Sequence, residues 1–394
     1  MLAVGQHDRV AVDDVRDGDE RTMRPALPLL RPALGRRRRR KGRGRRRSCS
    51  ATRRARGRRR PGRARGTAGG GETDCDARER ADRHPGHGLS VRLRLSPPAS
   101  PAALLFAVGL GDSVVGVAHD CDYPPEAADR PVVSASLVDT AELTSAEVDA
   151  AITEAAASGR SLYAIDADVW SEIEPDAVIV QETCEVCAVS TGDLKELERV
   201  RTVSAETVLF SPSTLEGILA SIVDLGVRFG ADAEADELTG GMRTRLRRVE
   251  AALAQVDSSP RVFVSEWLEP PFSAGHWVPD MVHLAGGTDV AGMSGEPSSR
   301  MRWPDVAALE PDVVVLAPCG LDLDRTLAEL NPLELSAHLL GTPARRDSRV
   351  FAVDGNAYFS RPGPRVADGV EVLAHLLHPE AYPDPGLPWI RVRV

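Results

Sequence analysis

Two stretches of this chain carry nearly the same order of residues, and this repeat limits the folds that the chain can adopt. Ile-Glu-Pro-Asp-Ala-Val-Ile-Val at 173–180 is matched by Leu-Glu-Pro-Asp-Val-Val-Val-Leu at 309–316. Each stretch ends in a short apolar run without polar alternation, as is typical of a strand buried on both faces of a parallel sheet. Helices alternate with such strands along the chain. The repeat therefore predicts two α/β lobes of similar build.

The chain divides into two parts of opposite charge. Residues 1–100 hold 28 Lys and Arg against 11 Asp and Glu, whereas the remaining residues hold 21 against 47. The stretch 35–65 is almost entirely Arg, Gly, Ala and Pro, too poor in apolar residues to form a core. We therefore expect residues 1–98 to be a disordered, Arg-rich segment.

Three interpretations of that segment stay open. It is typical of GC-rich DNA translated upstream of the true start or out of frame, since the chain has 47 Arg and only two Lys. The others are a native disordered tail and a basic arm for nucleic acid or an anionic membrane. No signal peptide is readable, and no apolar run approaches the roughly 20 residues of a membrane span.

The rest of the chain is expected to fold around a long helix. Helical stripes and capping residues predict an α/β lobe over 99–231, a connecting helix over 232–257 and a second α/β lobe over 258–394. Apolar residues at 238, 242, 246, 249, 253 and 256 form one continuous stripe along the connecting helix. As the single crossover, this helix would be a stiff strut of about 36 Å.

The segment 263–281 is rich in aromatic residues and prolines. A short strand at 261–265 leads into Glu266 and Trp267, two adjacent prolines, Phe272 and then Gly-His-Trp at 275–277. Paired prolines and a glycine fix an irregular backbone. Aromatic side chains on such a loop make a good wall for a large, flat ligand. The alternative is that they pack under the loop as a small satellite core.

Four cysteines lie in the folded part: Cys121, Cys184, Cys187 and Cys319. A zinc site from Cys121, Cys184 and Cys187 with His119 fits no known zinc spacing. A redox Cys-x-x-Cys after a strand, a disulfide, and thiols that line the cleft or pack in the lobe are the other interpretations. We assign no metal ligand. No catalytic motif is present either, so we expect the chain not to be an enzyme.

Five motifs resemble one family: GLGDSVVGVAHDCDYPP, PDAVIVQETCEVCAVS, EWLEPPFSAGHWVPDMVHLAGG, PDVVVLAPCGLDLDRT and DGNAYFSRPGPR. They are similar to the vitamin B12 (corrinoid)-binding branch of the iron-siderophore/cobalamin solute-binding proteins of ABC importers, over about residues 104–380. The resemblance implies two Rossmann-like lobes joined by one long helix, the class III periplasmic-binding-protein fold of the helical-backbone type. Residues 92–100 depart from the strand and loop with which the family opens.

The resemblance further implies that a corrinoid sits in the cleft between the lobes. Stacking and apolar contacts are expected from Tyr123, Trp267, Phe272, Trp277, Trp303, Tyr358 and Phe359. Polar contacts to the corrin amides and the nucleotide loop are expected from His119, Gln181, Glu266, His276, Arg300 and Arg361. His276 is also a candidate axial ligand of cobalt.

On this resemblance the chain captures cobalamin as a transported ligand and delivers it to the permease of an ABC importer. We expect a monomer without an intrinsic cofactor, whose folded part binds no nucleic acid. One alternative is a ferric siderophore or haem as the ligand. Another is a cytoplasmic metal- or corrinoid-handling enzyme that uses Cys184 and Cys187. The family function places the protein outside the cytoplasm, and a cytoplasmic location stays the alternative.

Overall fold

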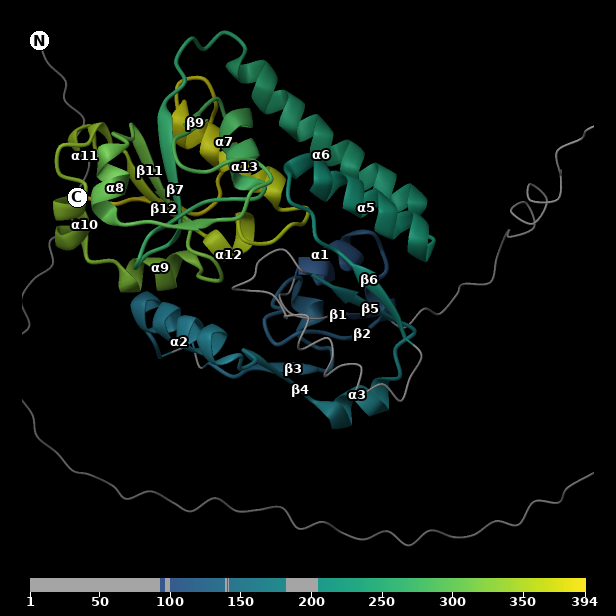
Figure 1. Cartoon of the computed structure of the whole chain (residues 1–394). Coiled ribbons are helices and arrows are strands. Elements are labelled where there is room, and N and C mark those ends of the chain that lie inside the picture. Colours follow the sequence, from purple (N-terminus) through teal and green to yellow (C-terminus); the bar gives the residue numbers. More distant parts are fainter. Residues whose placement is uncertain (1–92, 96–99, 139, 141, 182–204) are drawn as a thin grey trace, which may run out of the picture. The chain divides into compact units, whose positions relative to one another are not determined.

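The structure, a computed structural model, describes residues 93–95, 100–138, 140, 142–181 and 205–394 (Figure 1). All of them belong to one compact unit, 85–394. The expectations for residues 1–92 and for Cys184 and Cys187 therefore lie outside the described residues. No described helix is long and apolar enough to cross a membrane.

The first sheet is entirely parallel and lies in the N-terminal part of this unit. Its strands run in the order β2 (Val114–Gly116), β1 (Leu93–Leu95), β5 (Ala177–Val180) and β6 (Glu206–Leu209). β1 lies inside the segment 1–98, so the folded part starts before the expected boundary. This short strand was not predicted, because an arginine separates its two leucines. It pairs with β2 and β5.

One further strand of the N-terminal part lies outside this sheet. β4 (Tyr163–Ile165) forms a separate antiparallel ribbon with β3 (Ser134–Ser136). Each residue of β4 is only half-buried, whereas β5 is buried throughout. A half-buried strand does not fit the centre of a sheet that is covered on both faces. Around the sheet and ribbon lie α1 (Ser100–Ala107), α2 (Ser145–Ser158) and α3 (Ala167–Ile173).

The second sheet holds the C-terminal part of the chain. Its main path runs β10-β8-β7-β11-β12-β13, with β9 beside β7. Four of its strands are parallel: β7 (Arg261–Trp267), β9 (Thr288–Asp289), β11 (Val313–Leu316) and β12 (Val350–Val353). Antiparallel pairing adds three more toward the edges: β8 (Phe272–Ser273), β10 (Ser299–Arg300) and β13 (Trp389–Arg391). The helices of this part are α7 (Val278–Leu284), α8 (Trp303–Ala308), α9 (Leu323–Glu329), α10 (Pro332–His338), α11 (Pro343–Arg346), α12 (Gly355–Tyr358) and α13 (Val366–Leu377).

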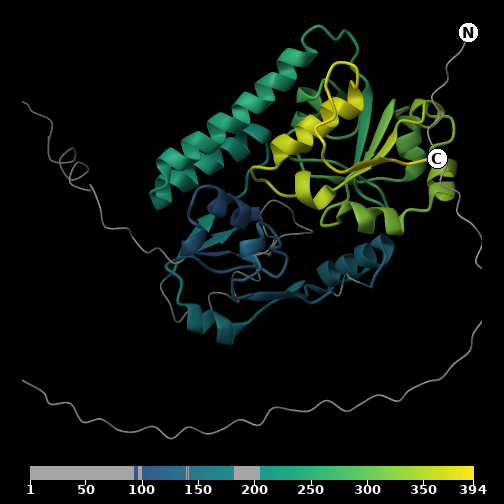
Figure 2. The same cartoon turned by 180° about the vertical axis from the view of Figure 1, so that it is seen from behind.

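Two long helices connect the sheets. α5 (Leu215–Phe229) and α6 (Asp232–Leu253) lie side by side in both views, and α6 also packs on α13 (Figures 1 and 2). α6 ends four residues before the expected position 257. Its expected stripe is partly buried, with Met242, Leu246, Val249 and Leu253 in the core. The largest apolar cluster continues from α1 through α5 and α6 to α13.

The sequence repeat has a counterpart in the backbone. α3 leads through Glu174 into β5, and α8 leads through Glu310 into β11. Both glutamates adopt the left-handed conformation, with φ of 40° and 47°. β5 and β11 each lie between two parallel neighbours. The repeated residues thus build the same helix–turn–strand unit in both lobes.

The contact of α5 with α6 predicts different effects for one substitution at two glycines. A Cβ on Gly226 would lie 2.4 Å from the Cβ of Ala235, whereas a Cβ on Gly240 would meet nothing within 4 Å. Overpacking should make Gly226→Ala lower the free energy of unfolding by about 1–3 kcal/mol. Gly240→Ala should raise it by roughly 0.5–1 kcal/mol through helix propensity. Urea denaturation followed by circular dichroism measures both, and equal effects would contradict this packing.

Candidate functional site

Loops at the carboxyl ends of strands from both sheets contact each other through polar groups. Arg361, after β12, donates to both carboxylate oxygens of Asp122, which follows β2. It also donates to the backbone carbonyl of Asp120 at 2.9 Å. Asn356 donates to Asp122 Oδ2 at 3.0 Å. Asp122 is therefore held by two residues of the other lobe. Burial acts to raise the pKa of Asp122, but the hydrogen bonds and positive charge of Arg361 outweigh it and lower that pKa.

A second interlobe contact is made by the first turns of α2. The indole Nε1 of Trp267 donates to the Ser145 carbonyl at 2.9 Å, and the Ser145 backbone N–H donates to Glu329 at 2.7 Å. Arg300 donates to Asp149 at 2.6 Å and to Thr153 at 3.2 Å. We call these two sets of contacts, at Asp122 and at α2, the interlobe latch.

Two of the residues expected to make polar ligand contacts take part in the latch. Arg300 and Arg361 each form an ion pair with an acid of the opposite lobe in this structure. Their partners, Asp122, Asp149 and Asn356, were not predicted. Of the three, Asp122 alone carried a signal, because it lies between His119 and Tyr123, two expected ligand contacts.

The aromatic segment is more regular than expected. β7 extends to Trp267 and turns back into β8, so part of the expected loop is a hairpin. Glu266, an expected ligand contact, accepts from the Gly275 N–H at 3.3 Å and from the Ser298 hydroxyl. The backbone N–H of His276 donates to the Glu296 carbonyl at 2.7 Å. His276 has a φ of 52°, a strained conformation that places its half-buried imidazole beside the Trp277 ring.

Four of the expected stacking residues lie in the protein core instead. Trp277, Trp303, Tyr358 and Phe359 are all exposed by 8% or less. Trp277 Nε1 donates to the Phe359 carbonyl at 2.9 Å, and Trp303 stacks on His338. Neighbouring protein atoms occupy their faces, so they form no ligand wall in this structure. The satellite-core alternative describes Trp277 better.

The remaining expected residues stay partly accessible, with one exception. Trp267 and Phe272 are half-buried, Tyr123 is 40% exposed, and Arg300 lies over the Phe272 ring. His119 is exposed and its ring lies 3.2 Å from the Ser134 hydroxyl. Gln181, directly after β5, is only 3% exposed, and its Oε1 has no hydrogen-bond partner among the described residues.

The two described cysteines of the folded part, Cys121 and Cys319, are both free. Burial, followed by the charge of Asp120, raises the pKa of the Cys121 thiol to about 12. Such a thiol is neither a reactive nucleophile nor a ready metal ligand. The described residues contain no cluster of three or more His, Cys, Asp or Glu that could hold a metal.

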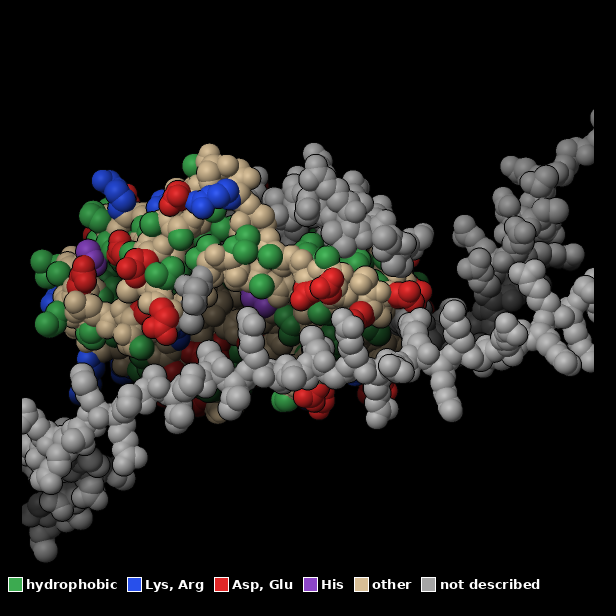
Figure 3. Space-filling model, turned by 90° about the horizontal axis from the view of Figure 1, so that it is seen from below, with side chains coloured by type: hydrophobic (Ala, Val, Ile, Leu, Met, Phe, Trp, Pro, Cys, Tyr) green, Lys and Arg blue, Asp and Glu red, His purple; other side chains and the backbone are tan. Residues whose placement is uncertain are grey.

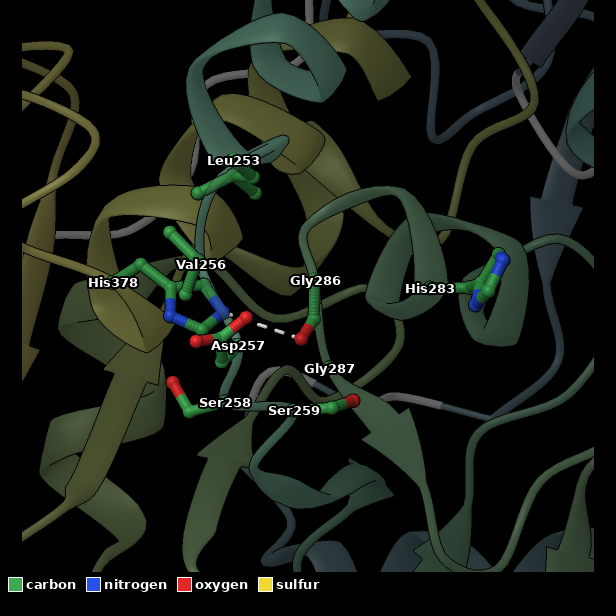
Figure 4. A pocket seen from close by; sticks show the side chains of 9 residues that line it. All are labelled: Leu253, Val256, Asp257, Ser258, Ser259, His283, Gly286, Gly287 and His378. Atoms are coloured by element: carbon green, nitrogen blue, oxygen red, sulfur yellow. Dashed lines mark hydrogen bonds between the residues drawn. The ribbon is translucent and has the colours of Figure 1, made fainter.

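Two pockets are lined by residues that are not part of the latch. One, of about 220 Å³, lies where α6 leads into β7 and includes His283, Gly286 and His378 (Figure 4). The His378 ring nitrogen there lies 3.2 Å from the Gly286 carbonyl. The other, of about 680 Å³, lies beside α2 and includes Leu137, Ala151 and Arg160. Figure 3, which views the molecule of Figure 1 from below, shows acidic side chains scattered over that face.

Comparison with known proteins gives the family. The model of the family described as periplasmic binding protein matches residues 98–357. The chain belongs to the periplasmic binding protein family. This is a family of solute-binding proteins rather than enzymes.

Individual relatives and structures agree with this assignment. A "Cobalamin-binding protein" of Halobacterium salinarum (strain R1) is 25% identical over 285 residues, which are 71% of this chain and 67% of the relative. A periplasmic heme binding protein of Pseudomonas aeruginosa superposes with a TM-score of 0.56 at 22% identity, covering 74% of this chain and 95% of that one. The vitamin B12 binding protein BtuF of Vibrio cholerae gives 0.54 at 19%, covering 73% and 97%. The class III periplasmic-binding-protein fold expected from the sequence is confirmed.

The ion pair of Asp122 with Arg361 should be energetically coupled. In a double-mutant cycle of Asp122→Asn and Arg361→Gln, we expect a coupling free energy of about 1 kcal/mol. The coupling is expected to be this small because the Asp122 side chain is 57% exposed. The exposed pair Arg302–Asp305 of α8 should show no measurable coupling. Urea denaturation of the single and double variants measures both.

The same pair should respond to pH in one direction. Because the folded-state pKa of Asp122 lies below its ordinary value of 3.8, the coupling is present above that value. It should be lost as the pH falls through the lower folded-state pKa. A coupling that grew on acidification would contradict the assignment.

The buried thiol of Cys121 should resist alkylation in the folded protein. Iodoacetamide at mildly alkaline pH should modify Cys319, which is only half-buried, before Cys121. Unfolding should make both react at similar rates. Peptide mass mapping resolves the two sites, and early modification of Cys121 in the native protein would show that its loop opens.

Proposed function

We propose that this protein captures a corrinoid, such as cobalamin, between its two lobes and delivers it to the permease of an ABC importer outside the cytoplasm. The observation that carries the proposal is the meeting of loops from the carboxyl ends of parallel strands in both sheets. In α/β proteins this edge of the sheet is where ligands bind. The similarity to a cobalamin-binding protein supports a corrinoid as the solute.

The chemistry of the latch suits a ligand rich in amides. Its contacts are hydrogen bonds and ion pairs of Asp122, Asn356, Arg361, Asp149 and Arg300. Corrin amides both donate and accept hydrogen bonds, so they are able to satisfy these groups when the lobes separate. Separation of the lobes at the latch would admit the ligand.

Trp267 and His276 are the residues best placed to contact such a ligand. The Trp267 indole takes part in the latch through its N–H and remains half-buried. The strained backbone of His276 is typical of a residue held for function. We propose that Trp267 contacts the corrin and that the His276 imidazole approaches the cobalt.

Haem is the second candidate ligand. The exposed imidazole of His119 and the partly exposed phenol of Tyr123 lie on one loop. Either group is a common axial ligand of haem iron. Haem would fit a flat ligand site built from the same loops, so it belongs in the same experiment.

Titration of the full chain with cyanocobalamin, haem and ferric siderophores tests the proposal. We expect saturable one-to-one binding of cobalamin, followed by tryptophan quenching and by the visible spectrum of the ligand. His276→Ala should abolish any shift of the cobalamin spectrum. His283→Ala, in the pocket of Figure 4, is the matched control and should change nothing.

The other outcomes discriminate between the alternatives. Folded protein that binds haem or a siderophore but no cobalamin would overturn the corrinoid assignment. Metal-dependent turnover that is lost in Cys184→Ser or Cys187→Ser would favour the enzyme alternative. Stoichiometric binding without turnover supports a solute-binding protein.

A further inference from the structure

Arg365 differs from the two latch arginines in the contacts that its side chain makes with the described residues. Arg361 and Arg300 each form an ion pair across the lobes. Arg365 makes no ion pair or side-chain hydrogen bond with the part of the chain that the structure describes. Its guanidinium carbon lies 3.9 Å from the centre of the Tyr123 ring, which belongs to the opposite lobe.

Arg365 is partly shielded from water, and the described residues around it supply no hydrogen-bond acceptor to its side chain. The residue is only partly exposed, and burial lowers its pKa below the ordinary value for arginine. The two nearby acids are engaged elsewhere. Asp354 accepts from the Ala357 backbone N–H at 2.6 Å, and Asp122 accepts from Arg361 and Asn356. Burial of such a cation is costly until a ligand provides acceptors for its N–H groups, so the binding of such a ligand is favourable.

The stacking on Tyr123 orients the free donors. A guanidinium that lies on an aromatic face keeps its N–H groups in the plane of the fork, directed outward past the ring edge. A planar fork fits the two oxygens of a phosphate or carboxylate, where two parallel hydrogen bonds form. Because Tyr123 and Arg365 come from opposite lobes, this fork lies beside the latch.

We propose that Arg365, supported by Tyr123, recognises an oxyanion of the captured ligand. The inference rests on the proposed function of the interlobe site. Two ligands offer this chemistry: a complete corrinoid through the phosphodiester of its nucleotide loop, and haem through its propionate carboxylates. Ligands that lack the anion should lose affinity, and that loss should depend on Arg365.

The test compares ligands that differ only in or near the anionic group. Wild-type protein is titrated with cobalamin against cobinamide, which lacks the nucleotide loop, and with haem against haem dimethyl ester. We expect the anionic ligand of the relevant pair to bind roughly tenfold or more tightly, as for a charge-assisted hydrogen bond. Arg365→Gln should bring that ratio close to one, and Arg365→Lys should restore part of it.

A control variant separates recognition from packing. Arg391 also lies over an aromatic ring, that of Phe351, on the edge strand β13. Arg391→Gln should leave both ligand ratios unchanged. Thermal melts of all variants show whether each one folds.

Two results would overturn the proposal. A ratio that Arg365→Gln leaves unchanged, in a variant that folds and binds, overturns the proposal and reduces Arg365 to a support for Tyr123. The proposed function survives that result. Wild-type protein that binds none of the four ligands overturns both.

Discussion

A charged side chain withdrawn from water needs a partner, and this requirement governs the contact between the two lobes. On the side of the long helices the lobes share a continuous apolar core that runs from α1 through α5 and α6 to α13. At the carboxyl ends of the strands the contact is made by Asp122 with Arg361 and by Asp149 with Arg300. The apolar side fixes the two sheets relative to the helices, while the polar side can exchange its partners.

The two sides differ in the free energy that is lost when the lobes separate. Separating apolar surfaces exposes them to water at roughly 25 cal/mol per Å², with nothing to compensate. Separating a hydrogen-bonded ion pair near the surface loses little, because water replaces the partner. Movement of the lobes should therefore be concentrated at the latch. α5 and α6, packed along their length, oppose bending on the other side.

The sequence predicted the regular parts of this structure better than the site. The buried strands at 177–180 and 313–316 lie at the ends of the two repeated stretches, where strands were predicted, because apolar runs of that kind suit only a strand covered on both faces. Thr144 and Glu147 form a capping box at the start of α2, since that motif is satisfied by residues three apart. Local patterns of this kind need no knowledge of the rest of the fold.

The site depended on contacts between residues far apart in the chain, and there the sequence was less informative. Trp277 and Trp267 lie on one segment, yet the first donates to Phe359 inside a lobe and the second to Ser145 across the lobes. Composition does not distinguish an indole that lines a cleft from one that fills a core. Likewise, Arg361 and Arg365 are four residues apart and chemically identical. Only the position of Asp122 on the other lobe gives Arg361 an ion pair, whereas Arg365 forms none with the described residues.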